Sequence, residues 1–210
     1  MSLHILVADD HLIVRQGLKL LIEREGFVVV GEASDGREAV RLSQELCPDI
    51  ALLDLNMPLL NGTDAGVAIM QASPKTKVIL LTVHAEDHHV LDALRAGFKG
   101  YVLKTKAAEE LIQAIREVAR GKLYLTPGVS EAVVQAYLAK TEMPPEPLSH
   151  REREVLQLVA EGKTTKEIGV VLGISTKTAE SHRTRIMAKL NIHETASLVR
   201  YAIRRGLVQP

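Results

Sequence analysis

Polar side chains that could do chemistry stand at the ends of short apolar runs in the first half of the chain. They are Asp9, Asp10, Asp54, Thr82 and Lys104. Three carboxylates packed together repel one another and resist ionisation unless a cation joins them, and hard oxygen ligands favour Mg²⁺. Because magnesium commonly takes one or two protein carboxylates together with a phosphate oxygen, this set predicts a metal and phosphate site.

Asp54 is the best candidate for a nucleophile, because it stands alone at the end of the central run and a carboxylate can accept a phosphoryl group. The Lys104 ammonium would pair with the added charge, and the Thr82 hydroxyl would donate to a phosphoryl oxygen. Each residue alone also fits a structural role: Asp10 could cap a helix, and Lys104 could be a solvated charge. All five residues stand at the carboxyl ends of expected strands, where a doubly wound sheet binds its ligands. This shared position favours a functional role over separate structural roles.

A parallel sheet with crossover helices is needed to bring these strand ends together, and the sequence pattern predicts one. Five apolar runs rich in branched residues are the expected strands, at residues 3–8, 27–33, 50–53, 78–82 and 100–103. Amphipathic stretches between them predict helices near 12–25, 37–46, 64–72, 87–96 and 107–119. Runs such as IALLD are apolar without alternation, which indicates strands covered by helices on both faces.

Composition places the chain among ordinary globular proteins. Its 210 residues are 46% apolar and 25% charged, which excludes a mainly disordered or fibrous protein. The N-terminal segment lacks the pattern of a signal peptide, and every apolar run is shorter than the roughly 18 residues that cross a bilayer. Cys47 is the only cysteine, which excludes an intramolecular disulfide and a multi-thiolate zinc site. We therefore expect a cytoplasmic protein.

The formal net charge of zero hides an asymmetry between two parts of the chain. Residues 1–140 carry 15 basic and 18 acidic side chains, whereas residues 141–210 carry 11 and 8. A short helix is expected at 128–140, and three prolines in residues 141–147 then predict a stiff, exposed linker. An acidic first part and a basic second part suggest that the second part binds a polyanion, although a solvated charged surface would give the same counts.

The second part has helical signals only. Ser149 with Glu152, and Thr164 with Glu167, match the capping box that starts a helix. The expected helices are 149–161, 164–172, 175–190 and 194–205. The second and third are joined by a short turn at Gly173, which is the arrangement of a helix-turn-helix.

The helix expected at 175–190 separates a buried stripe from a polar side. Ala179, Ile186 and Leu190 form the stripe. The side chains short or polar enough to enter a DNA major groove are Lys177, Glu180, Ser181, Thr184 and Ala188. The basic side chains beside them, where phosphates would run, are Arg183, Arg185 and Lys189. His182 lies between the two sides and could bind a phosphate or pack at a helix junction.

The motifs VADDH, DLNMPLLNG, LLTVH and KGYVLK occur in the order and at the strand positions of a response-regulator receiver domain, which residues 3–121 resemble. The resemblance implies a flavodoxin-like, five-stranded α/β fold in which Asp54 accepts a phosphoryl group from a histidine kinase. It implies a magnesium site formed by Asp9, Asp10, Asp54 and the main-chain carbonyl of Asn56, and it makes Lys104 the invariant lysine of the family.

The same resemblance implies a switch pair, in which the Thr82 hydroxyl moves toward the phosphoryl group and the Tyr101 ring turns inward. Val83 departs from the small residue that is more common after the switch threonine. Asn56 and His84 would flank the site and could tune the lifetime of the phosphoryl group.

The segment from Leu148 to Val208 resembles the four-helix, LuxR-type DNA-binding domain nearly end to end, and the whole chain resembles the NarL/FixJ family of response regulators. This implies an α/β receiver at 1–121, a linker with a short helix at 122–146, and an all-α helix-turn-helix domain at 147–210. The implied function is that of a bacterial two-component transcription regulator, which has no enzymatic activity apart from phosphoryl acceptance and slow self-dephosphorylation at Asp54.

The resemblance also implies how such a protein meets its partners. Double-stranded DNA would be bound by a homodimer that forms on phosphorylation; without phosphate, the receiver would cover the recognition helix or fail to dimerise. The family pattern makes Lys177, Glu180, Ser181 and Thr184 the groove readers, with His182 and Arg183 near the DNA backbone. Glu180 stands where a lysine is common, so operator preference is expected to differ. Ala179 replaces a usual valine, which should loosen the packing of this helix slightly.

Three other classes of protein stay open at this point. An aspartate-nucleophile phosphatase would use the same carboxylates, but it needs a second acid at the position of Asn56. A metal sensor could use His84, His88 and His89, although solvated histidines explain them as well. A pure protein-interaction module would explain the receiver and leave the basic helix unexplained.

Overall fold

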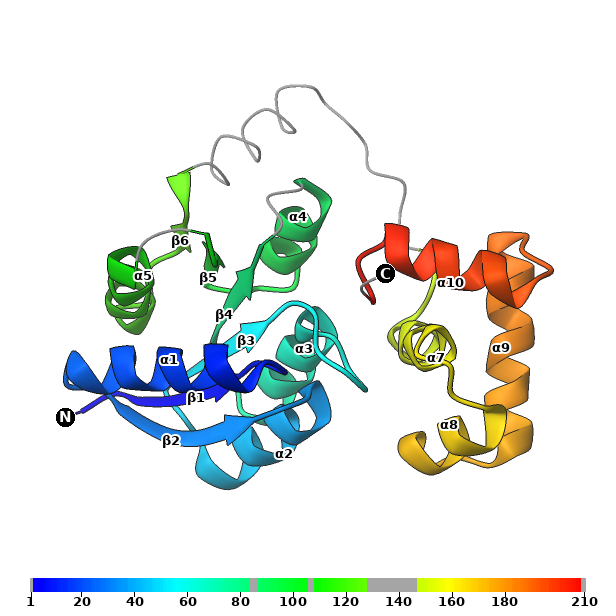
Figure 1. Ribbon diagram of the computed structural model, residues 1–210, viewed down its shortest axis with the longest axis horizontal. Helices are drawn as coiled ribbons and strands as arrows, with labels where there is room; N and C mark the ends of the chain where they lie inside the picture. The colour runs from blue at the N-terminus through cyan, green and yellow to red at the C-terminus, as the bar shows by residue number, and fades with distance from the viewer. Residues whose placement is uncertain (1, 84–86, 106–107, 128–146, 209–210) are drawn as a thin grey trace.

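The computed structural model describes residues 2–83, 87–105, 108–127 and 147–208, and these form two bodies (Figure 1). The first is a sheet with helices on both faces, and the second consists of helices. The short helix expected at 128–140 and nearly all of the proline-rich linker lie outside the described residues. Among the described residues, no helix is long and apolar enough to cross a membrane.

All neighbouring strands of the sheet pair in parallel, in the order β2-β1-β3-β4-β5-β6. The strands are β1 (His4–Ala8), β2 (Val28–Ala33), β3 (Ile50–Asp54), β4 (Lys77–Thr82), β5 (Gly100–Leu103) and β6 (Tyr124–Leu125). The fold class is confirmed, because the five predicted strands are present and the strand order reverses beside β1, as in doubly wound proteins. The sixth strand was missed, since two residues are too few to show a pattern.

Strand β6 extends the sheet beyond residue 121, which was the expected end of the receiver. Thr126, which is fully buried, follows it: its N–H donates to the Tyr101 carbonyl at 3.1 Å, and its hydroxyl accepts from the Leu103 N–H at 3.2 Å. The sheet therefore extends to Leu125, and Thr126 ties the chain that follows it to β5.

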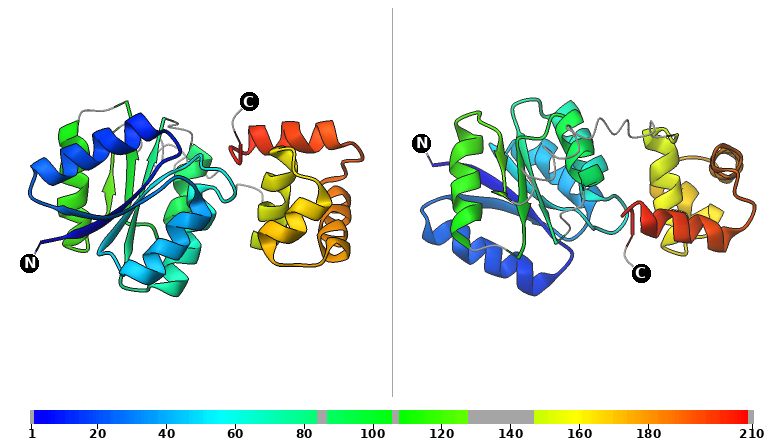
Figure 2. Two further views of the ribbon diagram at one scale, coloured as in Figure 1. Left: turned by 60° about the horizontal axis from the view of Figure 1, so that its bottom comes forward. Right: turned by 90° about the horizontal axis from the view of Figure 1, so that it is seen from above.

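Helices cover both faces of the sheet, as the apolar strands required (Figure 2). They are α1 (Leu12–Arg24), α2 (Gly36–Leu46), α3 (Gly62–Ala72), α4 (Asp87–Arg95) and α5 (Ala108–Ala119). Ile22 of α1 and Ile115 of α5 pack on one face, whereas Ala39 of α2, Ile69 of α3 and Val90 of α4 pack on the other. All five residues of β3 are buried, so Asp54 ends a fully covered central strand.

The C-terminal body consists of four helices around its own apolar core. They are α7 (His150–Ala160), α8 (Thr165–Leu172), α9 (Thr176–Leu190) and α10 (Thr195–Arg204). Both predicted capping boxes are present, at Ser149 with Glu152 and at Thr164 with Glu167. Gly173 adopts φ 64°, a left-handed conformation that glycine reaches at low cost, and this ends α8 before α9 begins.

Helix α7 is covered on two sides. Five consecutive residues, from Val155 to Val159, are buried, which a helix with a single apolar face would not show. One side packs in the C-terminal core, and the other faces the loop that follows β3, while α9 lies on the far side of the domain (Figures 1 and 2). The two bodies therefore meet through α7 rather than through α9.

Candidate functional site

Strand ends bring the predicted residues together, because β3 lies between β1 and β4 in a parallel sheet. The Lys104 ammonium lies 2.7 Å from Asp9 Oδ2 and 2.8 Å from Asp54 Oδ1. The Lys104 main-chain N–H also donates to the Thr82 carbonyl at 2.7 Å, which fixes the start of the loop after β5. Residues nearly one hundred positions apart thus form one charged cluster.

Burial dominates the electrostatics of Asp54, whose side chain is only 5% exposed. It raises the pKa of this carboxyl to about 6, against the opposing attraction of the Lys104 ammonium. Burial would lower the pKa of Lys104, but Asp54 and Asp9 together hold it above its ordinary value. At neutral pH, Asp54 is therefore mostly an ionised carboxylate that is poorly solvated, which suits a nucleophile.

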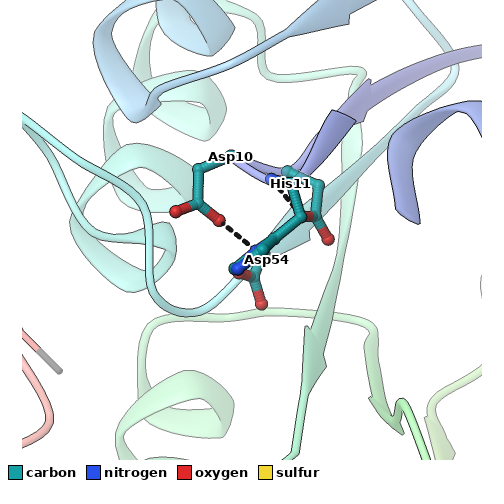
Figure 3. A group of neighbouring side chains, drawn as sticks. Asp10, His11 and Asp54 are labelled. Carbon is teal, nitrogen blue, oxygen red and sulfur yellow. Dashed lines mark hydrogen bonds and ion pairs between the residues drawn. The ribbon is translucent and has the colours of Figure 1, made fainter. Parts of the chain in front are cut away.

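Among the described residues, four side chains could hold a metal ion. Asp9, Asp10, His11 and Asp54 each place one ligand atom so that all lie within 4.8 Å of one another. Figure 3 shows Asp10, His11 and Asp54 of this group. The carboxylate oxygens are the hard ligands that Mg²⁺ prefers, so the residues fit this ion. His11, whose Nδ1 is 2.7 Å from Asp10 Oδ1, was not predicted, although it ends the VADDH motif directly after the two acids.

The loop after β3 lies beside the acidic residues of this site. Asn56 and Asp10 line the same cavity of about 240 Å³, and the Asn56 side-chain oxygen is buried without a hydrogen-bond partner among the described residues. Gly62 closes the loop: its N–H donates to the Leu55 carbonyl at 2.8 Å, and a Cβ there would lie 2.0 Å from the Asp54 carbonyl oxygen. Only glycine permits this close approach.

The two predicted switch residues are both buried. Thr82 ends β4, and Tyr101 lies in β5, where its ring packs in the core on the side of α2, α3 and α4. Val83 is 54% exposed, so its larger side chain points into solvent at the edge of the site. His84 lies outside the described residues, as do the side chains of His88 and His89.

Helix α9 presents the predicted groove-reading side chains to solvent. Lys177, Glu180, Ser181 and Thr184 are exposed, and Ala179 and Ile186 of the opposite stripe are buried. Leu190 is half-buried, as are His182 and Arg183. Within the part of the chain that the structure describes, the receiver does not cover this face of α9 (Figure 1).

Two basic side chains of α9 are engaged within the domain. The Lys189 ammonium lies 2.7 Å from the buried carboxylate of Glu152, and it is the first cause of a Glu152 pKa lowered to about 2. Arg183 donates to the Thr195 hydroxyl at 2.6 Å. Lys189 therefore stabilises the helix junction, which the expectation of a phosphate contact did not anticipate.

The chain joins a doubly wound sheet that has an acidic site at its strand ends to a helix-turn-helix body. This combination is that of a two-domain regulator. Sequence comparison agrees for each part separately. Residues 5–116 match the response regulator receiver domain, and residues 146–202 match the luxR family of bacterial regulatory proteins.

Individual relatives match along nearly the whole length. Oxygen regulatory protein NreC from Staphylococcus carnosus (strain TM300) is 37% identical over 213 residues, covering 97% of this chain and 98% of that protein. Transcriptional regulatory protein LiaR from Bacillus subtilis (strain 168) is 40% identical over 209 residues, covering 98% and 99%. The solved structure of RcsB from Salmonella enterica serovar Typhimurium, bound to promoter rprA in the presence of a phosphomimetic, matches with a TM-score of 0.65 at 28% identity and covers 96% of this chain and 98% of that one.

The chain belongs to the NarL/FixJ family of two-component response regulators, with a receiver domain and a LuxR-type DNA-binding domain. It is a transcription regulator, and proteins of this kind work with histidine kinases and bind DNA. The family consists of transcription regulators rather than known enzymes, and receiver domains generally bind Mg²⁺.

Proposed function

We propose that Asp54 accepts a phosphoryl group from a histidine kinase, and that this modification controls DNA binding by α9. The observation that carries the proposal is the bridge from the Lys104 ammonium to Asp9 and Asp54, at 2.7 and 2.8 Å. It places one cation where an added phosphoryl group would bring negative charge.

The transfer step would use groups that follow the strand ends of the receiver. An Asp54 carboxylate oxygen attacks phosphorus in line and forms an O–P bond, while the N–P bond of the kinase phosphohistidine breaks. The imidazole nitrogen keeps the electron pair of that bond and takes up a proton from solvent. Lys104 pairs with the transferred oxygens, and Thr82 donates its hydroxyl to one of them. When bound by Asp9, Asp10, Asp54 and the Asn56 carbonyl, Mg²⁺ would neutralise charge on the transferred group.

The output of the switch is a homodimer that presents two α9 helices to double-stranded DNA. Exposed Lys177, Glu180, Ser181 and Thr184 favour direct reading of a major groove, with His182 and Arg183 near the backbone. Since the receiver leaves α9 uncovered, we favour control of dimerisation over masking of the recognition helix. Because a bacterial transcription regulator acts on DNA, we propose a cytoplasmic location.

Phosphorylation of the full chain tests this function directly. Incubation with Mg²⁺ and acetyl phosphate is expected to add one phosphoryl group at Asp54, found by mass spectrometry, and to raise both the mass in solution and the affinity for selected genomic DNA. Asp54→Asn should show none of these changes. Asp49→Asn is the matched control, because Asp49 lies at the opposite end of β3, where it accepts from the His4 N–H at 2.8 Å. Modification at another residue, or operator binding by Asp54→Asn as tight as that of the phosphorylated wild type, would refute the proposal.

A further inference from the structure

One side chain of the DNA-binding domain holds the receiver loop that follows the phosphoacceptor. Gln157 of α7 is fully buried. Its amide N–H donates to the Met57 carbonyl at 2.9 Å, and its amide oxygen accepts from the Asn61 main-chain N–H at 2.9 Å. The Asn61 side-chain N–H donates to the same oxygen at 3.2 Å. A single amide thus binds the loop at two points, four residues apart.

Further contacts surround this amide. Glu161, which directly follows α7, accepts at one carboxylate oxygen from the Leu59 N–H at 3.0 Å and from the Gln157 amide at 2.9 Å. The Leu59 side chain packs against the core of the DNA-binding domain. All loop residues from 57 to 61 therefore lie between two contacts made by α7, and the loop cannot move freely while the domains are docked.

Charged groups hold α7 in this position. Arg153 Nε donates to both Asp64 carboxylate oxygens at 3.2 and 3.3 Å, and His150 Nδ1 lies 2.9 Å from Asp64 Oδ1. Burial would raise the pKa of Asp64, but these two partners lower it to about 2. Arg37 and Glu154 add an ion pair at 3.3 Å. Asp64 lies in α3 and Arg37 in α2, so each of these ion pairs joins the receiver to α7 and favours one docked arrangement.

The clamped loop is the one that carries Asn56 into the acidic site. Asn56 directly precedes Met57, whose carbonyl accepts from Gln157. One cavity of about 240 Å³ is lined by Asp10 and Asn56 from the receiver and by Gln157 and Glu161 from α7. The geometry of the metal and phosphoryl site and the docking of the DNA-binding domain therefore depend on the same short segment.

We propose that Gln157 is a positioning residue for the receiver: it fixes the loop 55–61 in the conformation that loads Mg²⁺ at Asp9, Asp10, Asp54 and Asn56. The inference rests on the proposed function of that site. Thermodynamic linkage makes this effect reciprocal. If docking of the two domains raises the affinity for Mg²⁺ by some factor, bound Mg²⁺ raises the equilibrium constant for docking by the same factor. Loading then favours the arrangement seen here, in which α9 is exposed.

Calorimetric titration of the full chain with Mg²⁺ tests the role of Gln157 without using activity. Gln157→Leu keeps the size of the side chain and removes its hydrogen bonds, so we expect Mg²⁺ affinity to fall about fivefold or more. The matched control is Gln113→Leu, at an exposed position of α5, which should bind like wild type. Arg153→Met, which weakens docking, should also lower affinity and should add little to Gln157→Leu.

A second variant separates positioning from loss of folding within one protein. In Gln157→Glu, the ionised carboxylate cannot donate to the Met57 carbonyl and faces the Glu161 carboxylate, with Asp10 in the same cavity. Once protonated, the new carboxyl has one donor and one acceptor and restores both bonds. Its Mg²⁺ affinity relative to wild type is expected to be about fivefold low near pH 8 and to recover within about twofold near pH 5.5.

The possible outcomes distinguish this inference from the proposed function. Wild type that fails to bind Mg²⁺ or to be phosphorylated at Asp54 would overturn both. Wild type that does so, together with Gln157→Leu and Gln157→Glu variants whose affinities match it at each pH, would overturn the positioning role alone. A Gln157→Glu variant that stays equally weak at both pH values would also refute it, since protonation restores the bonds and not a damaged fold.

Discussion

Replacing the phosphoacceptor is expected to stabilise the metal-free receiver rather than weaken it. In Asp54→Asn, the side chain keeps its shape, but the charge that is buried at 5% exposure disappears. Lys104 loses one partner and keeps Asp9, which lies 2.7 Å from its ammonium. The outcome depends on whether burial or the attraction of Lys104 dominates at Asp54. The raised pKa of this carboxyl indicates that burial dominates.

The magnitude follows from the two pKa values. Asp54 titrates near 3.8 when unfolded and at about 6 when folded, so the folded chain binds its proton more tightly. The free energy of unfolding therefore falls as pH rises from 3.8 through 6, and the full cost above that range is about 3 kcal/mol. Asp54→Asn removes this cost at pH 7.5 and should raise the melting temperature of the receiver by roughly 10 °C. Near pH 4 the two proteins should melt together.

Differential scanning calorimetry in EDTA, at several pH values, measures this difference. Addition of Mg²⁺ should then stabilise wild type and leave Asp54→Asn nearly unchanged, because ligand binding to the folded state adds stability only where the carboxylate is present. If the variant melts below wild type at pH 7.5 in EDTA, the ion pair with Lys104 outweighs burial, and the reasoning about the site is wrong.

Four further results are expected. Gly62→Ala puts a Cβ against the Asp54 carbonyl, so the receiver should lose roughly 1–3 kcal/mol and be phosphorylated poorly; wild-type melting would contradict this. Lys189→Met leaves the buried Glu152 carboxylate without its cation, while the Ser149 N–H still donates to it at 2.7 Å. This loss should cost the DNA-binding domain about 1–3 kcal/mol in chemical denaturation, and an unchanged denaturation midpoint would contradict it. Because Lys189 and the Ser149 N–H together lower the pKa of Glu152 to about 2, the DNA-binding domain of the wild type should lose stability as pH falls from 4.5 toward 2. Glu180→Gln should change the preferred bases when DNA sequences are selected at a fixed salt concentration. It should change the salt dependence of DNA binding far less than Arg183→Ala does.

Local pattern was enough to predict most of the fold. The strands and helices of the receiver, and the four helices after it, begin and end within a few residues of the predicted limits. Hydrophobic period and capping residues determine such elements within a dozen residues, so the sequence carries them directly. Strand β6 was not predicted because its two residues, Tyr124 and Leu125, are too few to show a hydrophobic period.

The residues of the candidate site were predicted from their positions at strand ends. The two residues that were not predicted, His11 and Gln157, were missed for the same reason. Asp9, Asp54 and Lys104 meet because parallel strands end at one edge of the sheet, a rule that needs only the order of elements. His11 joins them through the turn after β1, and Gln157 reaches the site from another domain. Neither position has a local pattern that separates it from an ordinary polar residue.

The sequence by itself determined the elements, the strand-end chemistry and the division into two parts, since each depends on residue types and spacing along the chain. Only the tertiary structure decided that α7 docks on the loop after β3, that Lys189 pairs with Glu152 and that α9 stays exposed. These features depend on which surfaces pack together across separations that in places exceed one hundred residues of chain. The energies that select among such packings come from contacts that no local spacing encodes.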